Sequence, residues 1–124
     1  MVHLDTSFLI RALVAGSPQD RRLREWIKAG TPLGISNIVW TEFLCGPVEA
    51  PQIELAMRIV GERIPYTEDH AVLAARLFNS TGRRRGSLAD CMIAVTAVLA
   101  DAELATANLA DFRPFKALGL TLVD

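Results

Sequence analysis

The sequence is poor in cysteine and in long apolar runs, and each shortage excludes a class of protein. Its two cysteines, Cys45 and Cys91, exclude a disulfide-rich scaffold, and their apolar helical contexts favour buried free thiols. The longest apolar run, Leu88–Ala100, is too short to cross a bilayer. The apolar run from Phe8 to Gly16 is interrupted by Arg11 and follows no basic leader, unlike a signal peptide. We therefore expect a cytoplasmic protein without a membrane segment.

Several catalytic and ligand-binding arrangements are also missing. The sequence holds no candidate Ser-His-Asp arrangement and no P-loop lysine motif, and its glycines do not cluster into a phosphate-binding loop. The cysteines and the two histidines, His3 and His70, lack the spacing of zinc ligands. A net charge of −1 provides no overall field that would attract nucleic acid. Any such affinity must therefore come from a local patch.

What is present is typical of a globular α/β domain. With 124 residues, 51% of them hydrophobic, the chain is long enough for one domain, residues 1–124, with a sizeable core. Short apolar runs alternate with helical segments, which predicts a three-layer α/β/α sandwich with a mostly parallel central sheet. The expected strands are 2–4, 33–36, 64–66, 103–106 and 120–123. The expected helices are 6–15, 18–29, 37–45, 51–60, 68–80, 88–100 and 108–117.

The second predicted helix has clear signals at both ends. Ser17 is expected as its N-cap, with Pro18 in the first helical position and Asp20 closing a capping box. Gly30 is expected to end the helix, because glycine readily adopts the left-handed conformation found there.

The most unusual acidic residue is Asp90, in the first turn of a helix that is apolar nearly all the way round. None of the residues three or four positions away from Asp90 is basic, so the helix itself offers no cation to its carboxylate. This arrangement suggests a cation-binding site. The alternative is a capping box in which Asp90 closes back on Ser87, near the positive end of the helix dipole.

Three further positions carry acids or an amide near predicted strand ends. Asp5 directly follows the first strand, although it could simply cap the next helix. Glu42 has apolar neighbours on its helix, so we expect its carboxylate to point toward the core. Asn108 and Asp111 follow the fourth strand, where the alternative is that Asn108 caps the last helix, Asp111 closes its box and Phe112 packs beneath.

A parallel sheet delivers such positions to one edge, where ligands of α/β proteins bind. Three or four carboxylates that converge without a lysine or arginine repel one another unless a cation lies between them. Oxygen ligands of this kind suit Mg²⁺ or Mn²⁺. An acidic Mg²⁺ site suits phosphodiester hydrolysis, because the metal activates water and neutralises charge on the leaving oxygen.

The densest basic patch consists of Arg83, Arg84 and Arg85. It precedes Asp90 closely enough in the chain to hold a nucleic-acid backbone beside the predicted acidic site. The alternative is a solvated loop without a binding role.

Four motifs stand out along the chain: V-H-L-D-T-S-F-L-I at the N-terminus, T-E-F around Glu42, R-R-R-G-S-L-A-D-C-M-I-A, and L-A-T-A-N-L-A-D-F. Together they resemble PIN-domain ribonucleases, and most closely the VapC toxins of bacterial and archaeal toxin–antitoxin pairs. The similarity spans the whole chain, with the acids in the order and spacing of that family. It implies a compact α/β/α sandwich and Mg²⁺- or Mn²⁺-dependent endonucleolytic cleavage of RNA, with transfer RNA and ribosomal RNA loops as family targets.

The resemblance also implies roles for individual residues. Asp5 and Asp90 match the two central metal-binding aspartates, and Glu42 matches the acid between them. Thr6 matches the small hydroxyl residue that helps to position the first aspartate.

The fourth acidic position differs from the commonest family pattern. Many PIN domains carry an aspartate two residues after the threonine equivalent to Thr106, where this chain has Asn108. Asp111 resembles the variant in which the acid precedes an aromatic residue. We therefore expect Asp111 in the fourth position, with Asn108 assisting.

Toxins of this kind usually form homodimers and are inhibited by a VapB-type antitoxin, so the resemblance implies both partners. Two alternatives remain open. A haloacid-dehalogenase-like phosphatase would use Asp5 as nucleophile, but its second aspartate would fall at Ser7. A non-catalytic α/β module would use the same acids only to bind a metal ion or a basic peptide.

Overall fold

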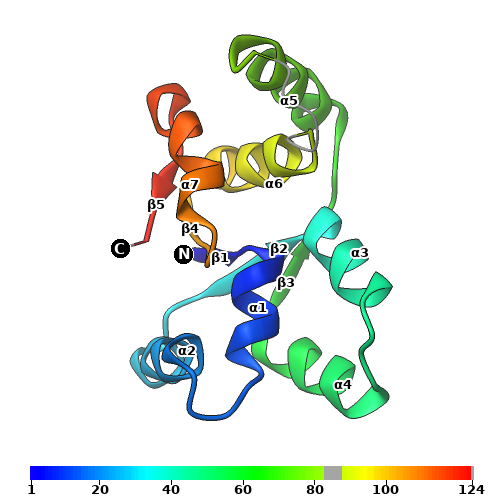
Figure 1. Cartoon of the computed structure of the whole chain (residues 1–124), viewed down its shortest axis with the longest axis vertical. Coiled ribbons are helices and arrows are strands. Elements are labelled where there is room, and N and C mark those ends of the chain that lie inside the picture. The colour runs from blue at the N-terminus through cyan, green and yellow to red at the C-terminus, as the bar shows by residue number, and fades with distance from the viewer. Residues whose placement is uncertain (83–87, 124) are drawn as a thin grey trace.

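The structure is a computed structural model that describes residues 1–82 and 88–123, and its centre is a parallel sheet (Figure 1). Its strands are β1 (Val2–Leu4), β2 (Leu33–Ser36), β3 (Glu62–Ile64), β4 (Glu103–Ala105) and β5 (Thr121–Leu122). They lie in the order β3-β2-β1-β4-β5, and all four pairings are parallel. The predicted parallel sheet is confirmed.

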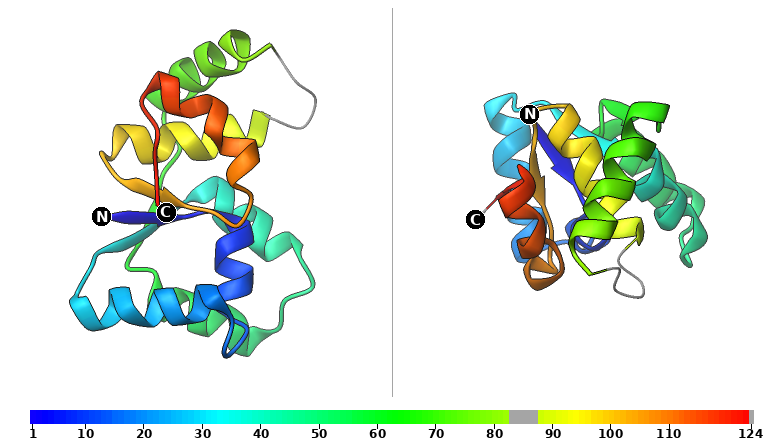
Figure 2. Two further views of the ribbon diagram at one scale, coloured as in Figure 1. Left: turned by 60° about the vertical axis from the view of Figure 1, so that its left-hand side comes forward. Right: turned by 90° about the horizontal axis from the view of Figure 1, so that it is seen from above.

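Helices cover both faces of this sheet, which gives the predicted three layers. The helical elements are α1 (Thr6–Ala12), α2 (Pro18–Ala29), α3 (Asn37–Cys45), α4 (Ala50–Ile59), α5 (Glu68–Ser80), α6 (Leu88–Leu99), α7 (Leu109–Phe112) and the 3₁₀ helix η1 (Arg113–Leu118). Helices α5, α6 and α7 lie on one face, and α1, α2 and α4 lie on the other (Figure 2, left). Among the described residues, no helix is long and apolar enough to cross a membrane.

Several boundaries differ from the sequence prediction, and those of the third strand and the first helix differ by two or three residues. The third strand was expected at 64–66 but ends at Ile64, because Pro65 has no N–H to donate to a sheet. This strand lies at the edge of the sheet. Helix α1 ends at Ala12 instead of residue 15, and the following segment forms turns.

The ends of α2 follow most of the predicted signals. The Ser17 hydroxyl accepts a hydrogen bond from the Asp20 amide (2.9 Å), and Gly30 adopts the left-handed conformation (φ 72°). The predicted capping box is wrong in one detail: the Asp20 carboxylate accepts from the amide of Gly16 (2.9 Å).

The apolar helix α6 lies in the core, as its sequence predicts. Its central residues from Ile93 to Ala97 are buried, and Leu88 and Leu99 at its two ends are about half exposed. Both cysteines are free thiols, but only Cys91 is buried. The prediction for Cys45 is wrong, because Cys45 lies at the exposed end of α3.

An unusual core residue is His3, in the central strand β1. It is 2% exposed, and neither ring nitrogen has a hydrogen-bond partner. It pairs with Gly34 of β2, and a Cβ atom on Gly34 would lie 3.1 Å from both Cδ2 and Nε2 of the imidazole. The imidazole therefore occupies the space that a side chain at Gly34 would need. Burial, with a smaller contribution from the N-terminal ammonium, lowers the pKa of His3 to about 4.

We predict that Gly34→Ala destabilises the protein by about 1–3 kcal/mol, because the new methyl group overpacks against the His3 ring. Urea denaturation measures the loss. Gly61→Ala is the matched control, since its Cβ meets only a backbone oxygen at 3.8 Å. In the His3→Ala background Gly34→Ala should cost markedly less, and an unchanged cost there would contradict the predicted clash.

The lowered pKa of His3 predicts a pH-dependent stability. Between pH 6.5 and about 4 the unfolded chain binds a proton at His3 that the folded protein does not, so stability falls as the pH falls through this window. The contribution is at most about 1.4 kcal/mol per pH unit. We expect His3→Phe to show a shallower loss of stability than wild type in urea denaturation over this range. Identical slopes would show that His3 takes no part.

Candidate active site at the carboxyl edge of the sheet

Asp5 directly follows β1 and is 4% exposed. Its backbone amide donates to the carbonyl of Ala105 (2.9 Å), which places it against the end of β4. Its carboxylate oxygen Oδ2 accepts hydrogen bonds from the hydroxyls of Ser7 and Thr106, both at 2.8 Å. Asp5 occupies the N-cap position of α1, but its side chain makes no capping hydrogen bond. The capping alternative therefore does not describe what this carboxylate does.

The two hydroxyls belong to a wider network that fixes the segment after β4. The Ser7 and Thr106 oxygens lie 3.3 Å apart, and the amide of Ala107 donates to Ser7 (3.1 Å). The amide of Asn108 donates to Thr106 Oγ1 (3.0 Å). The other Asp5 oxygen, Oδ1, accepts no hydrogen bond from the described residues and is not fully enclosed. One oxygen of Asp5 is thus held in place while the other stays available to a ligand.

Glu42 is joined to the same region by Thr6. The Thr6 hydroxyl donates to Glu42 Oε1 at 2.6 Å, linking α1 to α3. The expectation that Glu42 points into the core is wrong: its side chain is exposed, because α3 buries Val39 and Phe43 instead. The structure also gives Thr6 a different partner from the expected one. Its hydroxyl binds Glu42, while Ser7 and Thr106 bind Asp5.

Asp90 and Asp111 lie on α6 and α7, which cover the opposite face of the sheet from α1 (Figure 2, left). Asp90 is half-buried in the first turn of α6, which packs against α3 and α7. Asp111 is exposed on α7, and the next residue, Phe112, is buried. Asn108 is exposed and makes no side-chain capping hydrogen bond, so the alternative in which it caps the last helix does not hold. The predicted RNA-binding residues Arg83, Arg84 and Arg85 lie outside the described residues.

The elements that carry these side chains meet at the carboxyl ends of the strands. Figure 2 (left) shows the first turns of α1 and α6, together with α7, at the same end of the strands, with α1 on one face of the sheet and α6 and α7 on the other. Among the described residues, no three histidine, cysteine, aspartate or glutamate side chains form a group that could hold one metal ion. Asp5 and Glu42 nevertheless supply carboxylate oxygens, the donors that hard divalent ions prefer.

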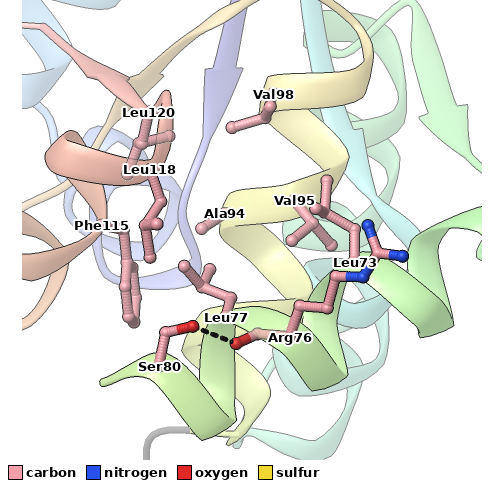
Figure 3. Close-up of a pocket in the computed structure, with 10 residues that line it drawn as sticks. All are labelled: Leu73, Arg76, Leu77, Ser80, Ala94, Val95, Val98, Phe115, Leu118 and Leu120. Atoms are coloured by element: carbon pink, nitrogen blue, oxygen red, sulfur yellow. Dashed lines mark hydrogen bonds between the residues drawn. The ribbon is translucent and has the colours of Figure 1, made fainter.

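A separate cavity of about 230 Å³ lies between α5, α6 and η1 (Figure 3). Its walls are mainly apolar, with Leu77, Ala94 and Phe115 among them, and no predicted site residue within the described chain lines it. The candidate site is therefore distinct from this cavity.

Comparison with known proteins identifies the family. The sequence profile of the PIN domain matches residues 2–115. The chain belongs to the PIN domain family. PIN domains are generally nucleases and typically use divalent metal ions, so the family assigns this PIN domain to the nucleases. No curated protein sequence matches it significantly.

Solved structures share its fold over nearly the whole chain. One similar structure is VapBC2 from Rickettsia felis, solved with a DNA fragment from the VapBC2 promoter. It superposes on this chain with a TM-score of 0.75 at 19% identity, and the match covers 99% of this chain and 98% of that chain. A toxin-antitoxin complex from Klebsiella pneumoniae has a TM-score of 0.72 at 27% identity, covering 91% of both chains. FitAcB from Neisseria gonorrhoeae has a TM-score of 0.71 at 20% identity, covering 100% and 97%.

The hydroxyl network predicts that Thr106→Val destabilises this PIN domain by roughly 1–2 kcal/mol, because the buried Asp5 carboxylate loses one of its two donors. Urea denaturation at neutral pH measures the loss, and Thr106→Ser should recover most of it. Thr41→Val is the control, because it removes only an exposed hydrogen bond to a helix carbonyl. Equal effects of Thr106→Val and Thr41→Val would count against a stabilising role for the Thr106 hydroxyl.

Proposed function

We propose that this PIN domain is a Mg²⁺- or Mn²⁺-dependent endoribonuclease and the toxin of a VapBC-type toxin–antitoxin pair. The observation that carries the proposal is the buried Asp5 carboxylate, with one oxygen held by Ser7 and Thr106 and the other available. A carboxylate oriented in this way at the carboxyl edge of a parallel sheet is suited to hold a divalent ion in a defined position.

Asp5, Glu42 and Asp90 would hold the ion, with Asp111 as the fourth acid and Asn108 assisting. When bound, a divalent ion activates water for attack on phosphorus and neutralises charge on the leaving oxygen. The hydrogen bonds of the chain orient this set: Ser7 and Thr106 fix Asp5, and Thr6 fixes Glu42. These links constrain Asp5 and Glu42, and the acids would have to come closer together to hold one ion, because no three of them among the described residues form such a group.

The proposed substrate is RNA, in a loop of transfer or ribosomal RNA. Arg83, Arg84 and Arg85 precede α6 directly in the chain and would contact the phosphate backbone near Asp90. Single-stranded loops are the natural target for a nuclease that must reach an individual phosphodiester bond, because their bases are already unstacked.

The proposed partners are a VapB-type antitoxin and a second copy of this chain. A solved structure that is 27% identical to this chain comes from a toxin-antitoxin complex, which supports an antitoxin partner. Inhibition by an antitoxin would require a segment that reaches the acidic side chains, and Glu42 and Asp111 are exposed on that side.

We predict that Asp5→Asn and Asp90→Asn each lower Mg²⁺-dependent RNA cleavage at least about 100-fold, because each removes a proposed metal-binding carboxylate. Cleavage of structured RNAs with Mg²⁺ or Mn²⁺ measures the effect, and thermal unfolding checks that the variants fold. Asp101→Asn is the control: Asp101 is exposed, and its positive φ (53°) is one that asparagine also adopts readily.

Other outcomes would favour the alternatives. If Asp90→Asn unfolds the chain while its folded fraction cleaves normally, Asp90 is a helix cap. Metal binding without cleavage, even at protein concentrations near those of the RNA, would favour a non-catalytic module. A phosphoryl or beryllofluoride adduct on Asp5 would favour the phosphatase, although Ser7 stands where that chemistry needs an acid.

The RNA target can be identified directly. Expression of wild type should arrest growth and leave new RNA ends at a small number of positions in total cellular RNA. Asp90→Asn, expressed to the same level, should leave none of them.

A further inference from the structure

Two positive charges on η1 have no partner in the part of the chain that the structure describes. Arg113 and Lys116 are both exposed, and neither side chain makes a hydrogen bond, an ion pair or a cation–π contact with another described residue. Arg24, by contrast, pairs with Asp20 at 2.9 Å. Residues 112–123 contain no aspartate or glutamate, so no acid of this segment offsets the two charges.

The geometry of η1 places both charges on one side of the helix. In a 3₁₀ helix, residues three positions apart eclipse each other, and the rise is about 2.0 Å per residue. Arg113 and Lys116 therefore lie one above the other, about 6 Å apart along the axis. The same spacing brings Phe115 and Leu118 together on another side, and both line the cavity between η1, α5 and α6 (Figure 3). The apolar side of η1 thus packs inward and leaves its two cations exposed to solvent.

Helix α7 connects these charges to the candidate active site. Arg113 keeps helical backbone angles (φ −52°, ψ −40°), so it lies one turn after Leu109. Leu109 lines a small cavity together with Thr106, and the Thr106 hydroxyl donates to Asp5. Figure 2 (left) shows α7 at the carboxyl end of the strands and η1 continuing from it toward α5. The charged side of η1 therefore begins one helical turn from a residue beside Thr106 and leads away from the site.

Unpaired cations next to an acidic site suit a ligand that carries several negative charges in a row. The carboxylates of the candidate site repel a phosphate backbone, so a substrate strand is held best by cations near the site but outside it. The Arg113 guanidinium can bind two oxygens of one phosphate, and the Lys116 ammonium can bind a phosphate as a point charge. Two cations in line along η1 can each take one phosphate of a strand that runs beside the helix.

We propose that Arg113 and Lys116 contact neighbouring backbone phosphates of the RNA, and so set the direction in which the strand leaves the site, along α7 and η1. This inference rests on the proposed ribonuclease function. The two residues position the strand and take no part in breaking the phosphodiester bond. Phosphate contacts of this kind fix the register of the strand without reading its sequence.

The test measures RNA binding separately from cleavage. The probe is a fluorescein-labelled pool of single-stranded RNA, about ten nucleotides long and randomised in sequence, bound in EDTA and followed by anisotropy. We expect the η1 double variant (Arg113→Ala and Lys116→Ala) to weaken binding roughly tenfold. Its log–log salt slope should fall by about 1.4, because each phosphate contact to a single strand contributes about 0.7. The exchange of Arg113→Lys and Lys116→Arg keeps both charges and should retain most of the binding.

The control double variant (Lys28→Ala and Arg58→Ala) removes one lysine and one arginine from elsewhere in the molecule. Both residues are exposed in the last turn of a helix, on α2 and α4, which cover the other face of the sheet (Figure 2, left). We expect it to bind the RNA pool with the affinity and salt slope of wild type. Thermal unfolding confirms that each variant is folded.

Steady-state cleavage with Mg²⁺ separates positioning from chemistry. The η1 double variant should raise KM roughly tenfold and change kcat less than about twofold, because the lost contacts hold the substrate and the transition state alike. A loss of kcat with an unchanged KM would assign Arg113 and Lys116 to the chemical step and overturn the positioning role.

Failure of these phosphate contacts and failure of the proposed function give different results. Equal affinities and salt slopes for the η1 and control double variants would overturn the contacts even if wild type cleaves RNA. Absence of RNA binding by wild type would also overturn them. Selective loss of binding in the η1 double variant, without any cleavage by wild type, would support the contacts and overturn the ribonuclease.

Discussion

The arrangement of this PIN domain depends on the compensation of one buried negative charge. A carboxylate taken out of water is costly unless hydrogen bonds replace those it loses, and Asp5 receives two from hydroxyl groups at 2.8 Å. One donor, Ser7, lies two residues away, and the other, Thr106, reaches Asp5 across the sheet from the end of β4. The hydrogen bond from Thr106 to Asp5 therefore helps to hold β1 and β4 in register. In turn, the pairing of these strands keeps Thr106 within reach of the Asp5 carboxylate.

The central position of β1 explains how one edge collects groups from distant parts of the chain. β1 is flanked by β2 on one side and β4 on the other. Helix α3 follows β2 and brings Glu42 to Thr6, while the segment after β4 brings Thr106 to Asp5. Because every pairing is parallel, both neighbours end on the same side as β1. Two hydroxyls at the start of α1 therefore connect β1 to its neighbours: Thr6 to Glu42 on the β2 side, and Ser7 to Thr106 on the β4 side.

Sequence patterns predicted the elements better than the side-chain environments. The alternation of apolar runs and helical segments was sufficient for the parallel sheet, and the apolar character of α6 was sufficient for its burial. The direction of Glu42 was predicted wrongly, because α3 has apolar residues on more than one side and only contacts with the sheet decide which of them are buried. Ser7 was considered only as a missing acid, since its role depends on Thr106, far away in sequence. The local D-x-S pattern gave a weak signal for the hydrogen bond to Asp5.

The residues that hydrogen-bond to Asp5 are synthesised at very different times. Thr106 is synthesised 101 residues after Asp5. β4, which completes the pairing on one side of β1, is made shortly before Thr106. Until Thr106 is made, the Asp5 carboxylate of the nascent chain has only one of its two hydroxyl donors, Ser7. A PIN domain with this topology therefore completes the hydrogen bonds around Asp5 only after β4 and Thr106 have been made and β4 has paired with β1.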